Sequence, residues 1–251
     1  MIEGYNILKD RMGHAPAIQL NEGDNHWYRT EENDWKPSVT TIIGGVINKG
    51  KGYDTWLGNQ PSYKIACDER DIAASHGTQV HEACEHYLNG KRIDGSNEGP
   101  EFNKRMMKFE HWVENRQPDI LATEQQMYHK DIPFSATCDI VIYTPDSGLS
   151  IVDIKTGAPY ETHALQLTCY KMLWDAMYPD FPIKNIFGLY LKGNWITKVE
   201  PLFKSYKYVP DVMEDVLGVW RWLIGSTGPK GRKPIKTSFQ LKKRVAEELN
   251  L

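Results

Sequence analysis

Three charged residues near the middle of the chain have the types and spacing of a phosphodiester-cleaving site. Asp139 lies within one apolar segment, and Asp153 and Lys155 end a second one fourteen residues later. Side chains two apart in a β-strand point the same way, so Asp153 and Lys155 are expected on one face. Two carboxylates repel each other unless a divalent cation lies between them. This grouping indicates metal-assisted cleavage of a phosphodiester bond.

The segments that carry these residues predict two neighbouring strands, at 134–143 and 149–155. The link between Tyr143 and Leu149 has the length and the turn-forming residues of a hairpin. Strict alternation in the first strand places Asp139 on one face. The opposite face is then predicted to carry Phe134, Ala136, Cys138, Ile140 and Ile142.

The rest of the pattern predicts one mixed central sheet with helices, in an α/β or α+β arrangement. A helix opens after Trp35, with Ser38 or Thr40 as its cap, and 68–88 reads as a long helix broken or bent near Gly77. Further helices are predicted at 101–113, 161–177 and 210–224. Further strands are predicted at 120–128, 185–192 and 195–203, the last two joined by a hairpin at Gly193-Asn194.

Composition limits the class of protein. The 251 residues carry a net charge of −3, which counts against a protein that coats nucleic acid by bulk electrostatics. No apolar run reaches the length of a membrane span, and the N-terminus carries no secretory signal. The four separated cysteines indicate buried thiols in a reducing compartment. Seven basic residues near the C-terminus form either a solvated face or a phosphate-contacting one: Lys230, Arg232, Lys233, Lys236, Lys242, Lys243 and Arg244.

Other polar residues sit where they could join the charged group. His81 lies on the predicted long helix, where it is a metal ligand or a surface histidine paired with Glu85. Gln166 and Tyr170 are four apart on the following helix and share a face. The roles of Glu124, on the preceding strand, and of Glu85 stay open.

Taken together, these motifs resemble the RecB-like exonuclease branch of the PD-(D/E)XK nuclease superfamily, including standalone phage exonucleases and mitochondrial genome-maintenance exonucleases. The matching pieces contain Gly77-Thr78-Gln-Val-His81, Cys138-Asp139, Asp153-Ile-Lys155-Thr-Gly157, Gln166-Leu-Thr-Cys-Tyr170 and the entry segment at 35–42. The resemblance covers about residues 35–200. It implies an α/β, restriction-endonuclease-like αβββαβ core with a mixed central sheet flanked by helices, preceded by an N-terminal helical segment. One nuclease domain is expected over 1–251, with a mainly helical part at 1–117, the catalytic sheet at 118–204 and a helix with a basic tail at 205–251.

The resemblance also implies a role for each matching residue. His81, Asp139 and Asp153 would hold Mg²⁺ or Mn²⁺, with the Ile154 carbonyl as an extra ligand. Lys155 would position or activate the attacking water, and Gln166 and Tyr170 would support it. The DNA-contacting set is expected to be Ser38, Thr78, Gln166, Tyr170, Lys230, Arg232 and Lys233.

The expected substrate is single- or double-stranded DNA with a free end, handled in phage or bacterial replication, recombination or repair in the cytoplasm. A replication or recombination protein is a candidate partner, and no membrane is expected. Polarity, strand preference, endo or exo action and oligomeric state stay open. Two alternatives remain: a non-catalytic nucleic-acid-binding protein on a nuclease fold, and a zinc hydrolase built on the segment from His81 to His86.

Overall fold

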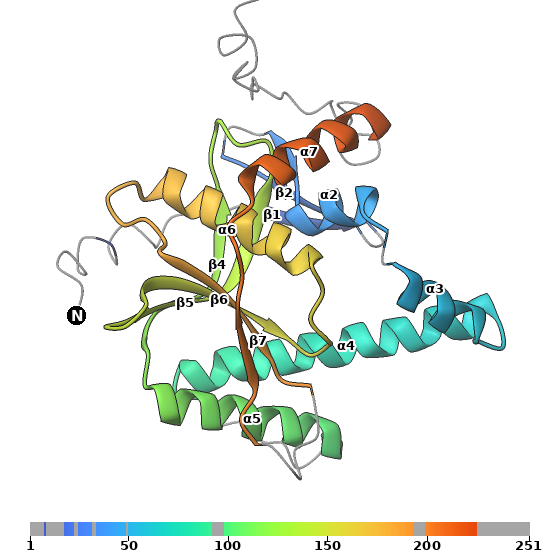
Figure 1. Ribbon diagram of the computed structural model, residues 1–251, viewed down its shortest axis with the longest axis horizontal. Coiled ribbons are helices and arrows are strands. Elements are labelled where there is room, and N and C mark those ends of the chain that lie inside the picture. The colour runs from blue at the N-terminus through green and yellow to red at the C-terminus, as the bar shows by residue number, and fades with distance from the viewer. Residues whose placement is uncertain are drawn as a thin grey trace, which may run out of the picture.

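The protein is a three-layer structure in which a central sheet lies between two groups of helices (Figure 1). The computed structural model describes residues 8, 18–22, 25–31, 34–48, 50–91, 98–192 and 199–224. Helices α4 and α5 cover one face of the sheet, and α6, with α2 and α7 against it, covers the other. None of the helices in this described part of the chain is long and apolar enough to span a membrane.

The central sheet has five strands in the order in which they occur in the sequence. All neighbours are antiparallel except β6 and β7, which are parallel and joined through α6. The strands are β4 (Asp119–Tyr128), β5 (Ser135–Thr144), β6 (Gly148–Lys155), β7 (Asn185–Tyr190) and β8 (Leu202–Ser205). Together with the helices that precede β4 and follow β6, this order confirms the predicted α/β class and its αβββαβ succession.

A second, smaller sheet precedes the helices. Its three antiparallel strands are β1 (Ile18–Glu22), β2 (Asn25–Arg29) and β3 (Trp35–Pro37). An isolated bridge between Ser38 and Ser135 joins it to the start of β5, and the Tyr28 hydroxyl lies 3.0 Å from Thr137 Oγ1. The small sheet is therefore fixed against the end of the β4–β5 hairpin.

The helices begin and end where local sequence dictates. Ser38 caps α2 by accepting a hydrogen bond from the Thr41 amide, and Pro100 opens α5. The helices are α2 (Val39–Val46), α3 (Lys51–Gly58), α4 (Tyr63–Leu88), α5 (Pro100–Arg116), α6 (Thr162–Met177) and α7 (Pro210–Ile224).

Of the break or bend expected near Gly77, the break is wrong, because α4 runs uninterrupted over 26 residues. A glycine lowers helix propensity by only about 1 kcal/mol and keeps its backbone donor and acceptor, so it need not interrupt a helix. A Cβ added at Gly77 would lie 3.4 Å from Thr156 Oγ1. The glycine thus lets α4 pass close to the chain that follows β6.

The predicted alternation of β5 holds only in its two halves. Ala136 and Cys138 pack into the core beneath α6, whereas Ile140 and Ile142 pack into the core beneath α4 and α5. Strict alternation would have placed all four side chains on one face, so that prediction is wrong. The switch of face falls at Asp139, between the two halves.

Other sequence predictions for the sheet have clear outcomes. The hairpin between β5 and β6 is confirmed, with Tyr143 opposite Leu149. Gly193-Asn194 lies outside the described residues, and the strand predicted at 195–203 is observed as Leu202–Ser205. The described cysteines are free thiols, and Cys84, Cys138 and Cys169 are buried as predicted, whereas Cys67 is partly exposed.

Gly188 tests how tightly the sheet is packed beside Asp153, its partner in the β6–β7 register. A Cβ at this position would lie 2.8 Å from the buried Tyr190 ring, which must then move. Gly188→Ala is expected to lower the free energy of unfolding by about 1–3 kcal/mol, measured by urea denaturation. Gly218→Ala, at an open position inside α7, is the control and should stabilise by up to about 1 kcal/mol. Equal midpoints for the two variants would contradict the packing.

Candidate metal and catalytic site

Asp139 occupies the point where β5 and β6 stop pairing. The register of these strands runs from Thr144–Gly148 to Ile140–Val152 and ends there. Beyond it, the Ile154 amide donates a 2.6 Å hydrogen bond to Asp139 Oδ2. The Asp139 carboxylate thus accepts the hydrogen bond that the Ile154 N–H would otherwise donate to a strand carbonyl. Its other oxygen is directed to the site.

His81 reaches this carboxylate from α4 on the neighbouring layer, with Nδ1 3.5 Å from Asp139 Oδ1. Burial of the imidazole lowers its pKa, but the negative charge of Asp139 and their hydrogen bond outweigh burial and raise the pKa to about 9. The same imidazolium more than offsets the effect of burial on Asp139, whose pKa lies below its usual value. Without a cation, the pair is therefore a proton-bridged ion pair at neutral pH.

Glu124 completes a close group with His81 and Asp139. One ligand atom from each of the three lies within 4.8 Å of the others, and no other such group is found among the described residues. The backbone of Glu124 has φ +45°, in the left-handed region that side chains other than glycine rarely adopt. Partial burial of its carboxylate, together with the charge of Asp139, raises its pKa to about 7.

Asp153 and Lys155 lie side by side on β6, as the spacing predicts, and form a 2.6 Å ion pair. The Asp153 side chain is 1% exposed. Burial, reinforced by the charge of Asp139, raises its pKa to about 6 against the opposing effect of Lys155. Asp153 is not one of the three closest ligand groups, but its ionisation is linked to both Asp139 and His81.

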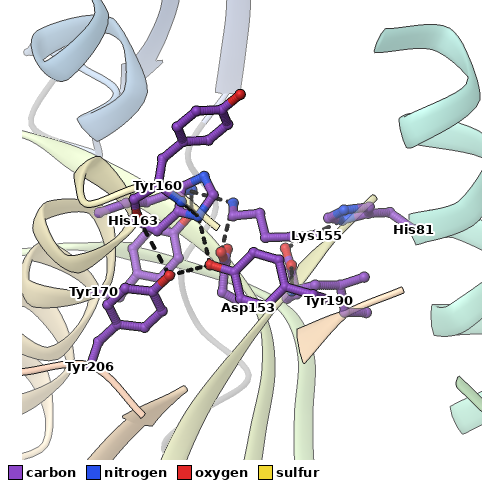
Figure 2. Close-up of polar contacts among 11 residues, drawn as sticks. His81, Asp153, Lys155, Tyr160, His163, Tyr170, Tyr190 and Tyr206 are labelled. Atoms are coloured by element: carbon purple, nitrogen blue, oxygen red, sulfur yellow. Dashed lines mark hydrogen bonds and ion pairs between the residues drawn. The ribbon is translucent and has the colours of Figure 1, made fainter. Parts of the chain in front are cut away.

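A chain of hydrogen bonds extends from Lys155, at the end of β6, to Tyr170 on α6, and Figure 2 labels these two residues. Lys155 Nζ donates to Gln166 Oε1 at 3.0 Å, and Gln166 Nε2 donates to the Tyr170 hydroxyl at 2.6 Å. The buried Tyr170 ring belongs to the core beneath α6. The amide and the phenol therefore hold the ammonium group in one position.

The acidic group opens into a cavity of about 450 Å³. His81, Glu124, Asp139 and Tyr170 line it, together with polar side chains of the small sheet and α2. Ser38 also lines this cavity, but its hydroxyl lies 2.8 Å from Thr40 Oγ1 and caps α2. The cavity gives a substrate direct access to the carboxylates.

Next to Lys155, sequence reasoning missed a second polar cluster, drawn in Figure 2. His163 Nδ1 lies 2.7 Å from the Tyr190 hydroxyl, which is hydrogen-bonded to Tyr206. Because the Tyr160 backbone N–H also points to Nδ1, that atom is an acceptor and the neutral ring carries its proton on Nε2. Burial and the charge of Lys155 lower the pKa of His163 to about 4. The spacing of His163 three residues before Gln166 was the available signal.

The remaining predicted residues have different outcomes. The Thr78 hydroxyl donates to the Ala74 carbonyl of its own helix at 3.3 Å and is exposed. The Ile154 side chain is buried in the core, and a ligand role for its carbonyl stays a prediction. His86 is exposed and outside the three-residue group, so the zinc-hydrolase alternative gains no support. The three basic residues predicted to contact DNA lie outside the described residues: Lys230, Arg232 and Lys233.

The donor types of the group fit a divalent cation. Carboxylate oxygens suit Mg²⁺, and an added imidazole nitrogen shifts the preference toward Mn²⁺. The side chains of His81, Glu124 and Asp139 supply one nitrogen and two carboxylates at the mouth of a cavity. The negative charge of Asp139 raises the pKa of Glu124, and a bound cation would relieve this repulsion between the two carboxylates.

Comparisons with known proteins show only a distant structural similarity. No protein-family model and no curated protein sequence matches it. Among solved structures it is similar to an alkaline exonuclease from Laribacter hongkongensis, with 11% sequence identity, a TM-score of 0.38, and coverage of 75% of this chain and 86% of that one. A similarity this distant leaves the chemistry of the site to its own side chains.

Metal binding at this group should depend on pH, because a cation must displace the proton shared by His81 and Asp139. Below a pKa of about 9, the neutral imidazole becomes tenfold scarcer for each pH unit. The apparent Kd for Mn²⁺ is therefore expected to fall about tenfold per unit from pH 7 to 8.5. Isothermal titration in buffers of different ionisation enthalpy measures the affinity and the protons released. Binding without proton release would exclude His81 as a ligand.

Replacing Glu124 tests the third ligand of the group. Glu124→Gln removes a carboxylate charge while keeping the size of the side chain, and should weaken Mn²⁺ binding about tenfold or more. Glu82→Gln is the matched control, since Glu82 is exposed beside His81 and lies outside the group. Equal affinities of the two variants, by the same titration, would remove Glu124 from the site.

Proposed function

We propose that the protein is a divalent-metal-dependent deoxyribonuclease of the PD-(D/E)XK superfamily, from its RecB-like exonuclease branch. One observation carries the proposal: His81 and Asp139, from distant segments, line one cavity, and the buried Asp153–Lys155 pair lies close enough for its charges to act on their pKa values. Perturbed carboxylates, an imidazole and an ammonium at a cavity are typical of a hydrolytic site.

The ligand set is assigned to His81, Asp139 and Asp153, as the family pattern implies, with Glu124 as an added carboxylate and the Ile154 carbonyl as a further oxygen. Mg²⁺ or Mn²⁺ held there would polarise the scissile phosphate and lower the pKa of a water molecule. Asp139 fits this part well because its second oxygen is already fixed by the Ile154 amide. A ligand held in advance loses little conformational freedom when the cation binds.

Lys155 is assigned to the water or the phosphate oxygen that gains charge during the reaction. Asp153 and Gln166 hold its Nζ from two sides, and Tyr170 fixes the amide of Gln166. A positioned ammonium stabilises developing negative charge without reorganisation. The Asp153 carboxylate would thus bind the metal ion, and the Lys155 ammonium would lie beside the phosphate.

The substrate is assigned as DNA with a free end, cleaved exonucleolytically in phage or bacterial replication, recombination or repair. Ser38 and Tyr170 line the cavity, and Gln166 contacts Lys155, so all three are suited to contact the substrate. Thr78 and the basic residues Lys230, Arg232 and Lys233 complete the proposed DNA-contacting set. Basic side chains would bind phosphates in a salt-dependent way.

The variant Asp139→Asn tests the loss of catalysis with less disturbance of the fold than Lys155→Ala. An amide oxygen can still accept the Ile154 N–H, whereas Lys155→Ala would leave the buried Asp153 without its ion-pair partner. Cleavage of end-labelled single- and double-stranded DNA in Mg²⁺ or Mn²⁺ is expected to fall at least about 100-fold in Asp139→Asn.

The control is Asp146→Asn, at an exposed position of the β5–β6 turn, which should cleave like the unmodified protein. Urea denaturation of both variants checks their folding. Full activity of a folded Asp139→Asn variant would refute the proposed chemistry. DNA binding without cleavage by the unmodified protein in either metal would show a non-catalytic binding protein instead.

A further inference from the structure

A second cavity, of about 610 Å³, adjoins the proposed catalytic site. It lies among α2, α3 and the start of α6, and its lining is mainly apolar. Ile43 and Ile47 contribute from α2, Tyr53 from α3, and Tyr160 and His163 from the α6 end. The catalytic roles assigned above make no use of this space.

Two residues connect this cavity to the site. Thr40 lines both cavities, so they meet at the first turn of α2. Gln166 lines the second cavity and accepts the hydrogen bond from Lys155 Nζ. If a phosphate is held beside Lys155, the base of the same nucleotide is therefore within reach of the second cavity.

The walls have the chemistry that a nucleobase needs. Tyr53 packs on Trp56 with ring centroids 5.4 Å apart, and Tyr160 packs edge-on against His163 at 5.7 Å. Figure 2 shows the Tyr160 ring directed away from Lys155, while Tyr190 orients His163. Aromatic rings stack on any base. The volume falls in the range of small-ligand pockets, which runs from about 300 to 1,000 Å³.

Polar groups at the edge can bond a base that has lost its pairing partner. Asn48 and Thr162 line the cavity and offer donors and acceptors. A paired base keeps its hydrogen-bonding edge inside the duplex and cannot enter an apolar space between helices. The cavity thus suits an unpaired base and not an intact base pair.

We propose that this cavity binds one unpaired nucleobase of the DNA strand whose phosphate lies at the catalytic site, so that Tyr53, Tyr160 and His163 determine a preference for single-stranded or frayed ends. The inference rests on the proposed nuclease function. It assigns the recognition of a base to α2, α3 and the start of α6, and the cleavage of the backbone to the group around Asp139.

Gly44 offers a way to fill the cavity without disturbing the fold. It lines the cavity from α2, and a Cβ added there meets nothing within 4 Å. A leucine side chain at this position would extend into the space for the base, whereas an alanine methyl would leave most of it open. Gly44→Leu and Gly44→Ala are therefore a matched pair, and both replace a glycine inside a helix.

The first experiment measures base binding without turnover. Each variant is made in the Asp139→Asn background, and single-stranded oligonucleotides carry 2-aminopurine at the 5′ end, the 3′ end or the centre. Stacking on an aromatic ring quenches 2-aminopurine, and fluorescence anisotropy measures DNA binding separately. Quenching at one position is expected with the parent and with Gly44→Ala, and its loss with Gly44→Leu. No quenching despite DNA binding, or equal quenching with both glycine variants, would overturn the inference.

The second experiment uses cleavage by the otherwise unmodified protein. Tyr160, 57% exposed, can be changed with little effect on the core. Tyr160→Ala should raise KM for single-stranded DNA about tenfold at similar kcat, the effect of about 1.4 kcal/mol of lost stacking. Tyr160→Phe should restore the parent KM. An oligonucleotide with an abasic site at the quenched position should be cleaved alike by all three proteins, and a tenfold difference there would contradict base recognition.

These outcomes separate the two proposals. Cleavage with an unchanged KM in Tyr160→Ala and no quenching would retain the nuclease and refute the base-binding cavity. Quenching that Gly44→Leu abolishes, in a protein that cleaves no DNA, would refute the nuclease and retain a nucleobase-binding cavity.

Discussion

The carboxylate of Asp139 is the interaction on which the site depends, because it stands where two strands of the sheet separate. Antiparallel strands that diverge leave buried amides without acceptors, at a cost comparable to a lost hydrogen bond for each. Asp139 satisfies the Ile154 amide with one oxygen and meets His81 with the other. The carboxylate supplies the acceptor that the Ile154 amide needs where the strands separate, and that amide in turn stabilises the negative charge of the carboxylate. The Asp139 side chain thus completes the hydrogen bonding of the sheet at this point and also lines the cavity.

Charge balance follows from this arrangement. Two buried carboxylates, Asp139 and Asp153, would be unfavourable alone, and each has a cationic neighbour, His81 or Lys155. The proton on His81 serves in the resting protein as the positive charge that a bound cation would later provide. Lys155 is held in place by Gln166. The site can therefore exchange a proton for a metal ion while its buried charges stay compensated.

Local rules predicted the parts of this site that lie within single elements. The β5–β6 hairpin follows from the length and turn-forming residues of its link, and the Asp153–Lys155 pairing and the Gln166–Tyr170 contact follow from spacings of two and four residues. The approach of His81 to Asp139 was inferred from a family resemblance, since no local rule relates a helix to a strand 58 residues away.

Features that depend on contacts between different elements could not be predicted from these local rules. The positive φ of Glu124 and the change of face at Asp139 depend on how β4 and β5 bend together. Alternation assumes a regular pleat, and an irregular strand pair shifts every side chain beyond it to the other face. The His163–Tyr190–Tyr206 cluster joins α6, β7 and the residue after β8, and the spacing of His163 from Gln166 does not reveal its two tyrosine partners.

Helix α4 divides into two halves with different surroundings. Val80, Ala83 and Cys84, around His81, are buried against the sheet layer, whereas Tyr63 and Ile72 in the first half are 72% and 70% exposed. Substitutions on exposed helix surfaces usually change stability by less than about 0.5 kcal/mol. Substitutions at exposed positions of the first half are therefore expected to be tolerated, whereas those in the half that presents the imidazole would disturb the packing that positions it.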